Sequence, residues 1–162
     1  MADTPLLTGL APVLDADIHT IILGSFPGAA SLQAQRYYAH PRNLFWKLLG
    51  AVLDEPLAEM PYEERLQRLL ARHIGLWDAL AACEREGSLD AAIRRPEAND
   101  HLLLKDLCPR LRRVCFNGKA SGRYAPIYAD AGYETVVLPS SSPANAHLSF
   151  DAKLALWQAV NR

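Results

Sequence analysis

Short apolar runs recur along the chain, and four of them predict β-strands. The four runs are residues 20–23 (TIIL), 74–77 (IGLW), 113–116 (RVCF) and 135–138 (TVVL). Two of them are dominated by β-branched residues and show no alternation of apolar and polar positions. This pattern is typical of strands that are buried on both faces of a parallel sheet.

Three further stretches space their apolar residues three and four positions apart, as on one face of an α-helix. They are residues 44–52, 66–70 and 154–160. Pro41 precedes the first stretch, where an early helical turn tolerates proline, and Asp151 precedes the last, where it suits the helix dipole. Strands that alternate with helices predict an α/β fold, in which helices cover both faces of a parallel sheet.

The chain has 162 residues, and this length predicts one domain that spans residues 1–162. The sequence contains no internal repeat, low-complexity tract or linker. Residues 54–64 (DEPLAEMPYEE) carry five acids, two prolines and no base, which predicts a surface connection.

The overall charge is close to neutral. Seventeen Lys and Arg against eighteen Asp and Glu leave a formal net charge of −1, which disfavours a nucleic-acid binder of the strongly basic kind. The bases are nevertheless segregated, because residues 24–53 hold three bases and no acid, and residues 110–123 hold five bases and no acid. This segregation fits either one positive face for an anionic polymer or chance clustering on a solvated surface.

Cysteine usage and hydropathy bear on the compartment. Cys83, Cys108 and Cys115 are an odd number with no CxxC pair, which argues against a disulfide framework, a zinc ribbon or an iron–sulfur cluster. We therefore expect reduced, buried thiols. The sequence has no apolar stretch near the roughly 20 residues of a membrane span and no signal-peptide basic region. These features predict a cytoplasmic protein without a membrane partner.

Loops rich in Gly, Ser, Pro and Asn follow the first, third and fourth predicted strands. They are residues 23–32 (LGSFPGAASL), 116–123 (FNGKASGR) and 138–147 (LPSSSPANAH). Such residues allow tight turns and close backbone approach to a ligand. Ligands of open α/β sheets bind outside the carboxyl ends of the strands, so we expect one site at this edge.

Three motifs, taken together, carry a family resemblance. They are GSFPG at 24–28, YYAHPRNLFW at 37–46 and LPSSSPANA at 138–146. In this order, at the ends of the predicted strands, they resemble the uracil-DNA glycosylase superfamily, and most closely its hypoxanthine-DNA (deoxyinosine) glycosylase branch. The resemblance implies a three-layer α/β/α sandwich with a four-stranded parallel sheet, and neither cofactor nor metal. It further implies a monofunctional enzyme that flips a deaminated base out of DNA and hydrolyses its N-glycosidic bond.

The resemblance assigns catalytic roles to two residues. Asn43, in HPRN, is expected to position the attacking water, because Ser25 occupies the place in the first motif where most of the superfamily has Asp or Asn. An amide is no strong base, but orientation suffices for water that attacks a cationic sugar. The alternative for Asn43 is a local hydrogen bond to the backbone at a helix start.

Other residues are expected to hold the base. Tyr38 matches the aromatic residue that stacks on the flipped base, and the adjacent Tyr37 is the alternative. Asn117 matches an amide that hydrogen-bonds the base edge; the alternative is a turn-forming Asn before a glycine. The expected backbone contacts to the base or water come from the first motif, at Gly24, Phe26 and Gly28.

The resemblance also predicts contacts with DNA, either double-stranded or single-stranded, by a monomer. The predicted contact residues are His40, Arg42, Lys119, Ser140, Ser141, Ser142, Pro143, Ala144 and Asn145. Ala144 takes the place of a larger wedge residue. Ser140 or Ser141 stands where the uracil-specific branch has a histidine that stabilises the leaving base.

Other functions are less well supported by the sequence. A uracil glycosylase of the mismatch type is the nearest alternative. A serine hydrolase could use Ser25 with His40 or His147, but GSFPG is not G-x-S-x-G and no Asp–His pair completes a triad. A non-enzymatic nucleotide-binding module would need a G-x-G-x-x-G or P-loop motif, and the sequence has neither.

Overall fold

The computed structural model describes residues 5–145 and 147–162. Its centre is a four-stranded parallel sheet in the order β3-β2-β6-β7. The strands are β2 (Thr20–Gly24), β3 (Ile74–Asp78), β6 (Arg113–Asn117) and β7 (Glu134–Leu138). All four predicted strands are thus confirmed, and every residue of β2 and β3 is buried, as the unbroken apolar runs indicated.

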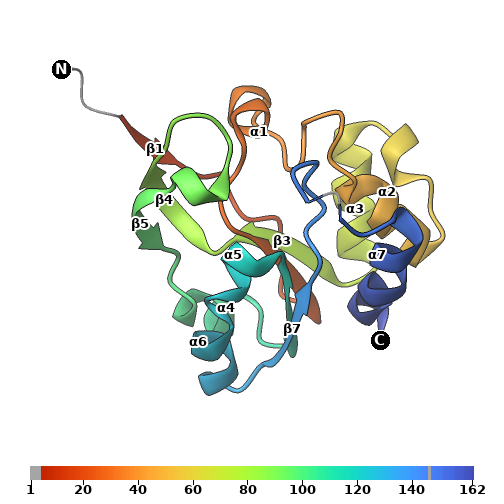
Figure 1. Cartoon of the computed structure of the whole chain (residues 1–162). Coiled ribbons are helices and arrows are strands. Elements are labelled where there is room, and N and C mark those ends of the chain that lie inside the picture. The colour runs from red at the N-terminus through yellow and green to blue at the C-terminus, as the bar shows by residue number, and fades with distance from the viewer. Residues whose placement is uncertain (1–4, 146) are drawn as a thin grey trace.

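Helices cover both faces of this sheet, so the predicted three-layer α/β/α sandwich is confirmed (Figure 1). One layer holds α2 (Phe45–Leu53), α3 (Tyr62–Ala71), α7 (Phe150–Trp157) and the short helices η1 (Leu57–Glu59) and η3 (Gln158–Asn161). The other layer holds α4 (Leu102–Leu107), α5 (Lys119–Gly122) and α6 (Ala125–Asp130). The three helices expected from apolar spacing correspond to α2, α3 and α7 with η3.

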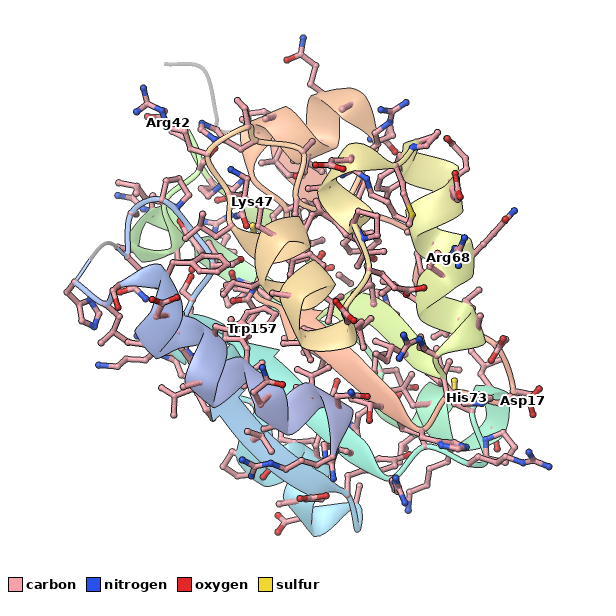
Figure 2. All side chains as sticks on the ribbon, turned by 90° about the vertical axis from the view of Figure 1, so that its right-hand side faces the viewer. Asp17, Arg42, Lys47, Arg68, His73 and Trp157 are labelled. Atoms are coloured by element: carbon pink, nitrogen blue, oxygen red, sulfur yellow. The ribbon has the colours of Figure 1, made fainter. Side chains whose placement is uncertain are left out.

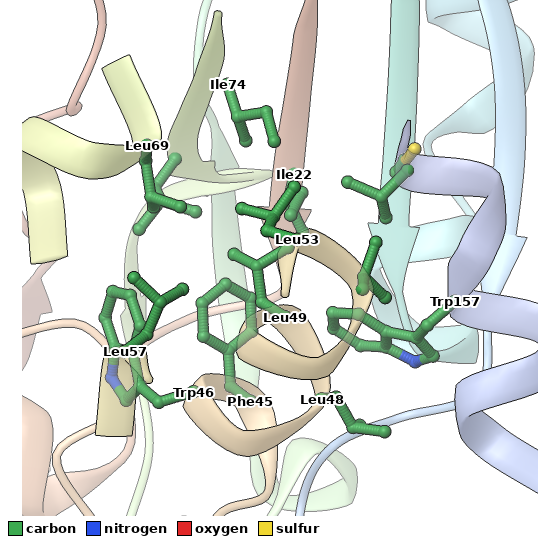
Figure 3. Close-up of a cluster of buried hydrophobic side chains, with 14 of the residues drawn as sticks. Ile22, Phe45, Trp46, Leu48, Leu49, Leu53, Leu57, Leu69, Ile74 and Trp157 are labelled. Carbon is green, nitrogen blue, oxygen red and sulfur yellow. The ribbon is translucent and has the colours of Figure 1, made fainter. Parts of the chain in front are cut away.

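The larger core cluster fixes α2 on the sheet. Figure 3 shows Phe45 between Trp46 and Trp157, and the Phe45 ring meets the other two edge to face at centroid distances of 4.9 and 5.6 Å. Above them in this view lie Ile22 of β2 and Ile74 of β3, which belong to the same cluster. Because α2 begins at Phe45, this packing holds the HPRN segment against the carboxyl end of the sheet.

A second sheet was not predicted. It is antiparallel, in the order β1-β4-β5, and consists of β1 (Leu6–Thr8), β4 (Leu80–Glu84) and β5 (Arg94–Ala98). β5 is exposed throughout and carries Pro96, which an edge strand tolerates. A short, charged edge strand has no apolar periodicity, and no pattern in the sequence therefore indicated it.

Residues 54–64 are more than a surface connection, so that prediction is wrong in part. Leu57 is fully buried in the large cluster, and α3 already begins at Tyr62. The acids do stay near the surface, where Glu55 forms an ion pair with Arg68 at 3.3 Å. Met60 and Tyr62, which are partly buried, pack against the same cluster, and the acidic composition of the segment gave no indication of these contacts.

The three cysteines are free and buried, as predicted. Asp151 lies in the first turn of α7. Ser149 caps the N-terminus of this helix, because its hydroxyl accepts a hydrogen bond from the Ala152 amide at 3.1 Å. Across residues 5–145 and 147–162, no helix is both long and apolar enough to span a bilayer.

Candidate active site

A cavity of about 490 Å³ lies at the carboxyl end of the parallel sheet. Its wall includes the last residues of three neighbouring strands, namely Gly24 of β2, Asp78 of β3 and Asn117 of β6. The loop after β7 and the segment before α2 complete this side. The three loops that the sequence placed at one edge of the sheet therefore meet around one hollow.

Most of the residues predicted for the site border this cavity. They are Gly24, Ser25, Phe26, Gly28, Tyr38, His40, Asn43, Asn117 and residues 140–145. Arg42 and Lys119 do not border it, although both are exposed and each lies next to a segment that does. The Phe26 ring is itself buried in a small cluster with Leu80 and Cys83.

Asn43 lies just before α2. The sequence suggested either a place in the candidate active site or a hydrogen bond to the backbone at the helix start, and the structure shows both. Its side-chain oxygen accepts a hydrogen bond from the Phe45 amide at 2.9 Å, and the residue also borders the cavity. The backbone bond holds the amide group in one orientation. An amide oxygen has a second lone pair and its nitrogen has two protons, so Asn43 retains the capacity to bind a water.

The two adjacent tyrosines have different surroundings. Tyr37 is buried, and its hydroxyl donates to the carbonyl of Ala11 at 2.9 Å. The Tyr38 ring instead stacks on Phe45, with a centroid distance of 3.8 Å and an interplanar angle of 11°. Within the described part of the chain, the buried Tyr38 hydroxyl has no hydrogen-bond partner. Both residues border the cavity, and Tyr38 is the one whose hydroxyl has no partner among the described residues.

Asn117 is bonded to the loop after β7. Its amide nitrogen donates to the Ser141 hydroxyl at 2.9 Å, and its oxygen accepts from the Ser141 backbone amide at 2.9 Å. Ser141 is fully buried, and its carbonyl accepts from the Leu44 amide at 3.0 Å. Asn117 therefore holds this loop in place, and one amide proton and one lone pair remain for a ligand.

A buried lysine supports the same loop from α7. Lys153 is 1% exposed, and its ammonium donates to the carbonyl of Asn145 at 2.6 Å. Burial lowers the pKa of Lys153. The sequence pattern did not indicate this residue, because an isolated lysine in an amphipathic helix usually lies in solvent.

The segment between β4 and η2 (Asp90–Ala92) forms the opposite wall, and no sequence pattern predicted this. The Ser25 hydroxyl donates to Asp90 at 2.6 Å, and the Ser88 hydroxyl accepts from the Ala29 amide at 2.9 Å, at the start of α1 (Ala29–Ala34). These hydrogen bonds join the GSFPG motif and the start of α1 to the segment that connects β4 with β5.

Arg85 also connects the GSFPG motif to the segment after β4. Its guanidinium donates to the carbonyls of Pro27 at 2.6 Å and Gly87 at 2.8 Å, and lies over the Phe26 ring at 5.3 Å. Arg85 is 4% exposed, so its charge is largely removed from water. Within the described residues, the hydrogen-bond partner of the Ser25 hydroxyl is the Asp90 carboxylate and not a histidine, which argues against the serine hydrolase alternative.

Asp78 is the main site residue that sequence reasoning missed. It is 4% exposed, and a Cβ atom placed on Gly24 would lie 2.5 Å from Asp78 Oδ1 and 3.0 Å from the Tyr38 hydroxyl. Glycine at position 24 therefore makes room for both polar groups on the cavity floor. Burial, and secondarily the charge of Asp90, raises the pKa of Asp78 to about 7, although Arg85 acts in the opposite direction.

Of the two interpretations of the basic segments, a single positive face holds only in part. Arg113, at the start of β6, is buried and bonded to Glu134 at 3.0 Å, and Arg110 pairs with Asp17 at 3.4 Å. Figure 2 shows Asp17 at the end of the molecule opposite Arg42. The idea that residues 110–123 form one face is thus wrong, because β6 separates the first bases of this segment from Lys119 by the length of a strand.

Comparisons with known proteins identify the family. Residues 11–161 match the model of the uracil DNA glycosylase superfamily, and the chain belongs to this superfamily. It is 46% identical over 154 residues to a protein of Methanosarcina acetivorans named hypoxanthine DNA glycosylase, covering 95% of this chain and 97% of the relative. A protein of the same name from Methanosarcina barkeri is 47% identical, covering 95% and 98%.

A solved structure agrees with the fold. It is a solution NMR structure of a protein from Methanosarcina acetivorans that is described as a candidate uracil DNA glycosylase. The two structures superpose with a TM-score of 0.86 at 42% sequence identity, covering 98% of this chain and all of the other. The family resemblance inferred from the three motifs is therefore confirmed.

Proposed function

We propose that this protein is a monofunctional DNA glycosylase that removes hypoxanthine from DNA. The observation that carries the proposal is one cavity at the carboxyl end of the sheet, bordered by Asn43, Tyr38 and Asn117 together with the GSFPG motif. The two relatives named hypoxanthine DNA glycosylase support this choice of base. A uracil glycosylase is the second candidate, favoured by the description of the solved relative.

The reaction needs the target nucleotide outside the helical stack, because the glycosidic bond is inaccessible within it. In the cavity the base stacks on Tyr38, and Asn43 orients a water toward C1′ of the sugar. The C1′–N9 bond breaks and its electron pair leaves with the base. The water oxygen then bonds to C1′, the water loses one proton, and the departing base gains one. The amide of Asn43 is not a base, so the acceleration comes from the orientation of the water and from polar groups that stabilise the charges of the transition state.

The proposed DNA contacts surround the mouth of the cavity. Ala144 is exposed in the loop after β7, and His40 and Arg42 precede α2. Alanine is a small wedge, so extrusion of the nucleotide depends on a base pair that is already weak. A pair that contains hypoxanthine meets this condition better than a normal pair.

Single-turnover excision from matched duplexes tests the choice of base. We expect hypoxanthine to be released at least about tenfold faster than uracil, because a purine anion offers additional ring nitrogens for hydrogen bonds. Ser141, at the place of the leaving-base histidine, is fully buried and bonded to Asn117, so it supplies no cation to a uracil anion. Faster release of uracil would favour the second candidate.

Salt dependence tests the proposed DNA face. The logarithm of the affinity should fall linearly with the logarithm of the salt concentration, by about 0.9 for each phosphate contact. We expect Arg42→Gln and Lys119→Gln each to reduce this slope by about 1. Arg110→Gln is the matched control, because Arg110 pairs with Asp17 at the opposite end of the molecule. If the slope changes only in the Arg110 variant, the DNA binds at the opposite end of the molecule and the proposed DNA face is wrong.

A further inference from the structure

Two buried polar groups without partners lie on the floor of the cavity. Within residues 5–145 and 147–162, neither Asp78 Oδ2 nor the Tyr38 hydroxyl has a hydrogen-bond partner. Native proteins rarely leave such groups unpaired. Asp78 borders the cavity, so a ligand bound there is the candidate partner of its carboxyl group. Asp78 Oδ1, the other oxygen of this carboxyl group, and the Tyr38 hydroxyl both approach the position of a Cβ atom on Gly24, so the two side chains lie next to each other on the floor of the cavity.

The surroundings of Asp78 decide its protonation state. From the side of the second sheet it faces Arg85, which directly follows β4, and from η2 it faces Asp90. From the segment before α2 it faces the phenols of Tyr37 and Tyr38, whose pKa values burial raises, so both stay neutral. Arg85 uses its guanidinium to hold two backbone carbonyls and not Asp78.

Desolvation therefore dominates at Asp78. It favours the neutral acid, and the nearby negative charge of Asp90 acts in the same direction, so the pKa of Asp78 rises to about 7. A neutral carboxylic acid has a proton to donate, whereas a carboxylate only accepts hydrogen bonds.

We propose that Asp78 is a further catalytic residue, a neutral carboxylic acid that donates a hydrogen bond to an acceptor atom of the bound base. This inference rests on the proposed function. As the C1′–N9 bond breaks, its electron pair spreads over the ring nitrogens and the carbonyl oxygen of hypoxanthine. Each of these atoms is a hydrogen-bond acceptor, and a donor aimed at one of them stabilises the developing charge. An ionised Asp78 would repel the same anion.

The pH dependence of single-turnover excision tests this role, with enzyme in excess over a duplex that carries one deoxyinosine. For the wild type we expect a constant rate below pH 7 and a fall of about tenfold per pH unit above it, as the acid ionises. Asp78→Asn keeps a donor and cannot ionise. We expect its rate to stay within about threefold of the wild type at pH 6 and to be flat up to pH 8.5.

Two further variants separate this role from a structural one. Asp78→Ala should lose about 10-fold to 100-fold at pH 6, the usual effect of one hydrogen bond to a charged group. Asp90→Asn keeps the acceptor for the Ser25 hydroxyl and removes the charge that raises the pKa of Asp78. Its rate should therefore start to fall at a lower pH than that of the wild type, while a melting curve confirms that each variant is folded.

The outcomes distinguish this inference from the proposed function. A wild type that releases no hypoxanthine at any pH would refute the proposed function itself. A wild type that is active with a rate rising through pH 7, together with an inactive Asp78→Asn, would mean that the carboxylate form acts. That result would overturn the role of Asp78 and leave the proposed function intact. The same holds for an Asp78→Asn rate that falls with pH as the wild-type rate does, and for full activity of Asp78→Ala.

Discussion

Asn43→Ala is expected to lose about 100-fold to 1000-fold of the single-turnover rate on deoxyinosine DNA, the usual effect of removing one oriented polar group from a catalytic site. In the proposed mechanism, Asn43 is the group that orients the attacking water. Its side chain also accepts a hydrogen bond from the Phe45 amide, so the alanine variant should lose about 1 kcal/mol of stability as well. Rapid-quench kinetics and thermal melting measure the two effects separately.

Asn43→Ser is the matched control for the structural part. A serine hydroxyl can still accept from the helix start, but it is too short to replace the amide in the cavity. We expect this variant to melt close to the wild type and to lose activity nearly as Asn43→Ala does. Ser25→Ala should be milder, because Ser25 contacts Asp90 and does not orient the water in the proposed mechanism. Near-normal rates in both Asn43 variants would disprove the assignment.

Tyr38→Ala is expected to lose about 10-fold to 100-fold of the rate, because stacking of a base on an aromatic ring contributes about 1–3 kcal/mol. The variant also loses the stack on Phe45, so its melting temperature should fall. The measurement is single-turnover excision over a range of enzyme concentrations, which separates binding of the flipped base from the chemical step.

Tyr38→Phe separates the ring from the hydroxyl. It keeps the stacking surface and removes a buried hydroxyl that has no partner within the described structure. If the ring is what holds the base, this variant should stay within about threefold of the wild type. A loss as large as that of Tyr38→Ala would show that the hydroxyl, and not the stacked ring, contacts the base.

The parallel sheet and its helices were predictable because their burial is simple. β2 lies between two strands and between two helical layers, so the residues after Thr20 are apolar or glycine and the run is easy to recognise. The antiparallel sheet has the opposite character. β5 is exposed at each position, and pairing with β4, which no local pattern encodes, is what makes it a strand.

The location of the site followed from the loops at the carboxyl ends of the strands, but its polar floor did not. Asp78 ends an apolar run, so the same rule that selected Asn117 could have selected it. Its burial, however, depends on contacts with Gly24 and Tyr38 from distant segments. The bonds that join Ser25 to Asp90 and Arg85 to Pro27 span 65 and 58 positions, which no local spacing can reveal.

Product analysis on a duplex with a single deoxyinosine tests the proposed glycosylase activity most directly. The duplex is incubated with excess protein, and the released small molecules are identified by mass spectrometry while the strands are resolved with and without alkali. We predict free hypoxanthine in an amount equal to the alkali-sensitive sites, in strands that remain intact until alkali is added. Strand cleavage without free hypoxanthine, or no release at all under conditions where Asn43→Ala and the wild type are equally folded, would contradict the proposed function.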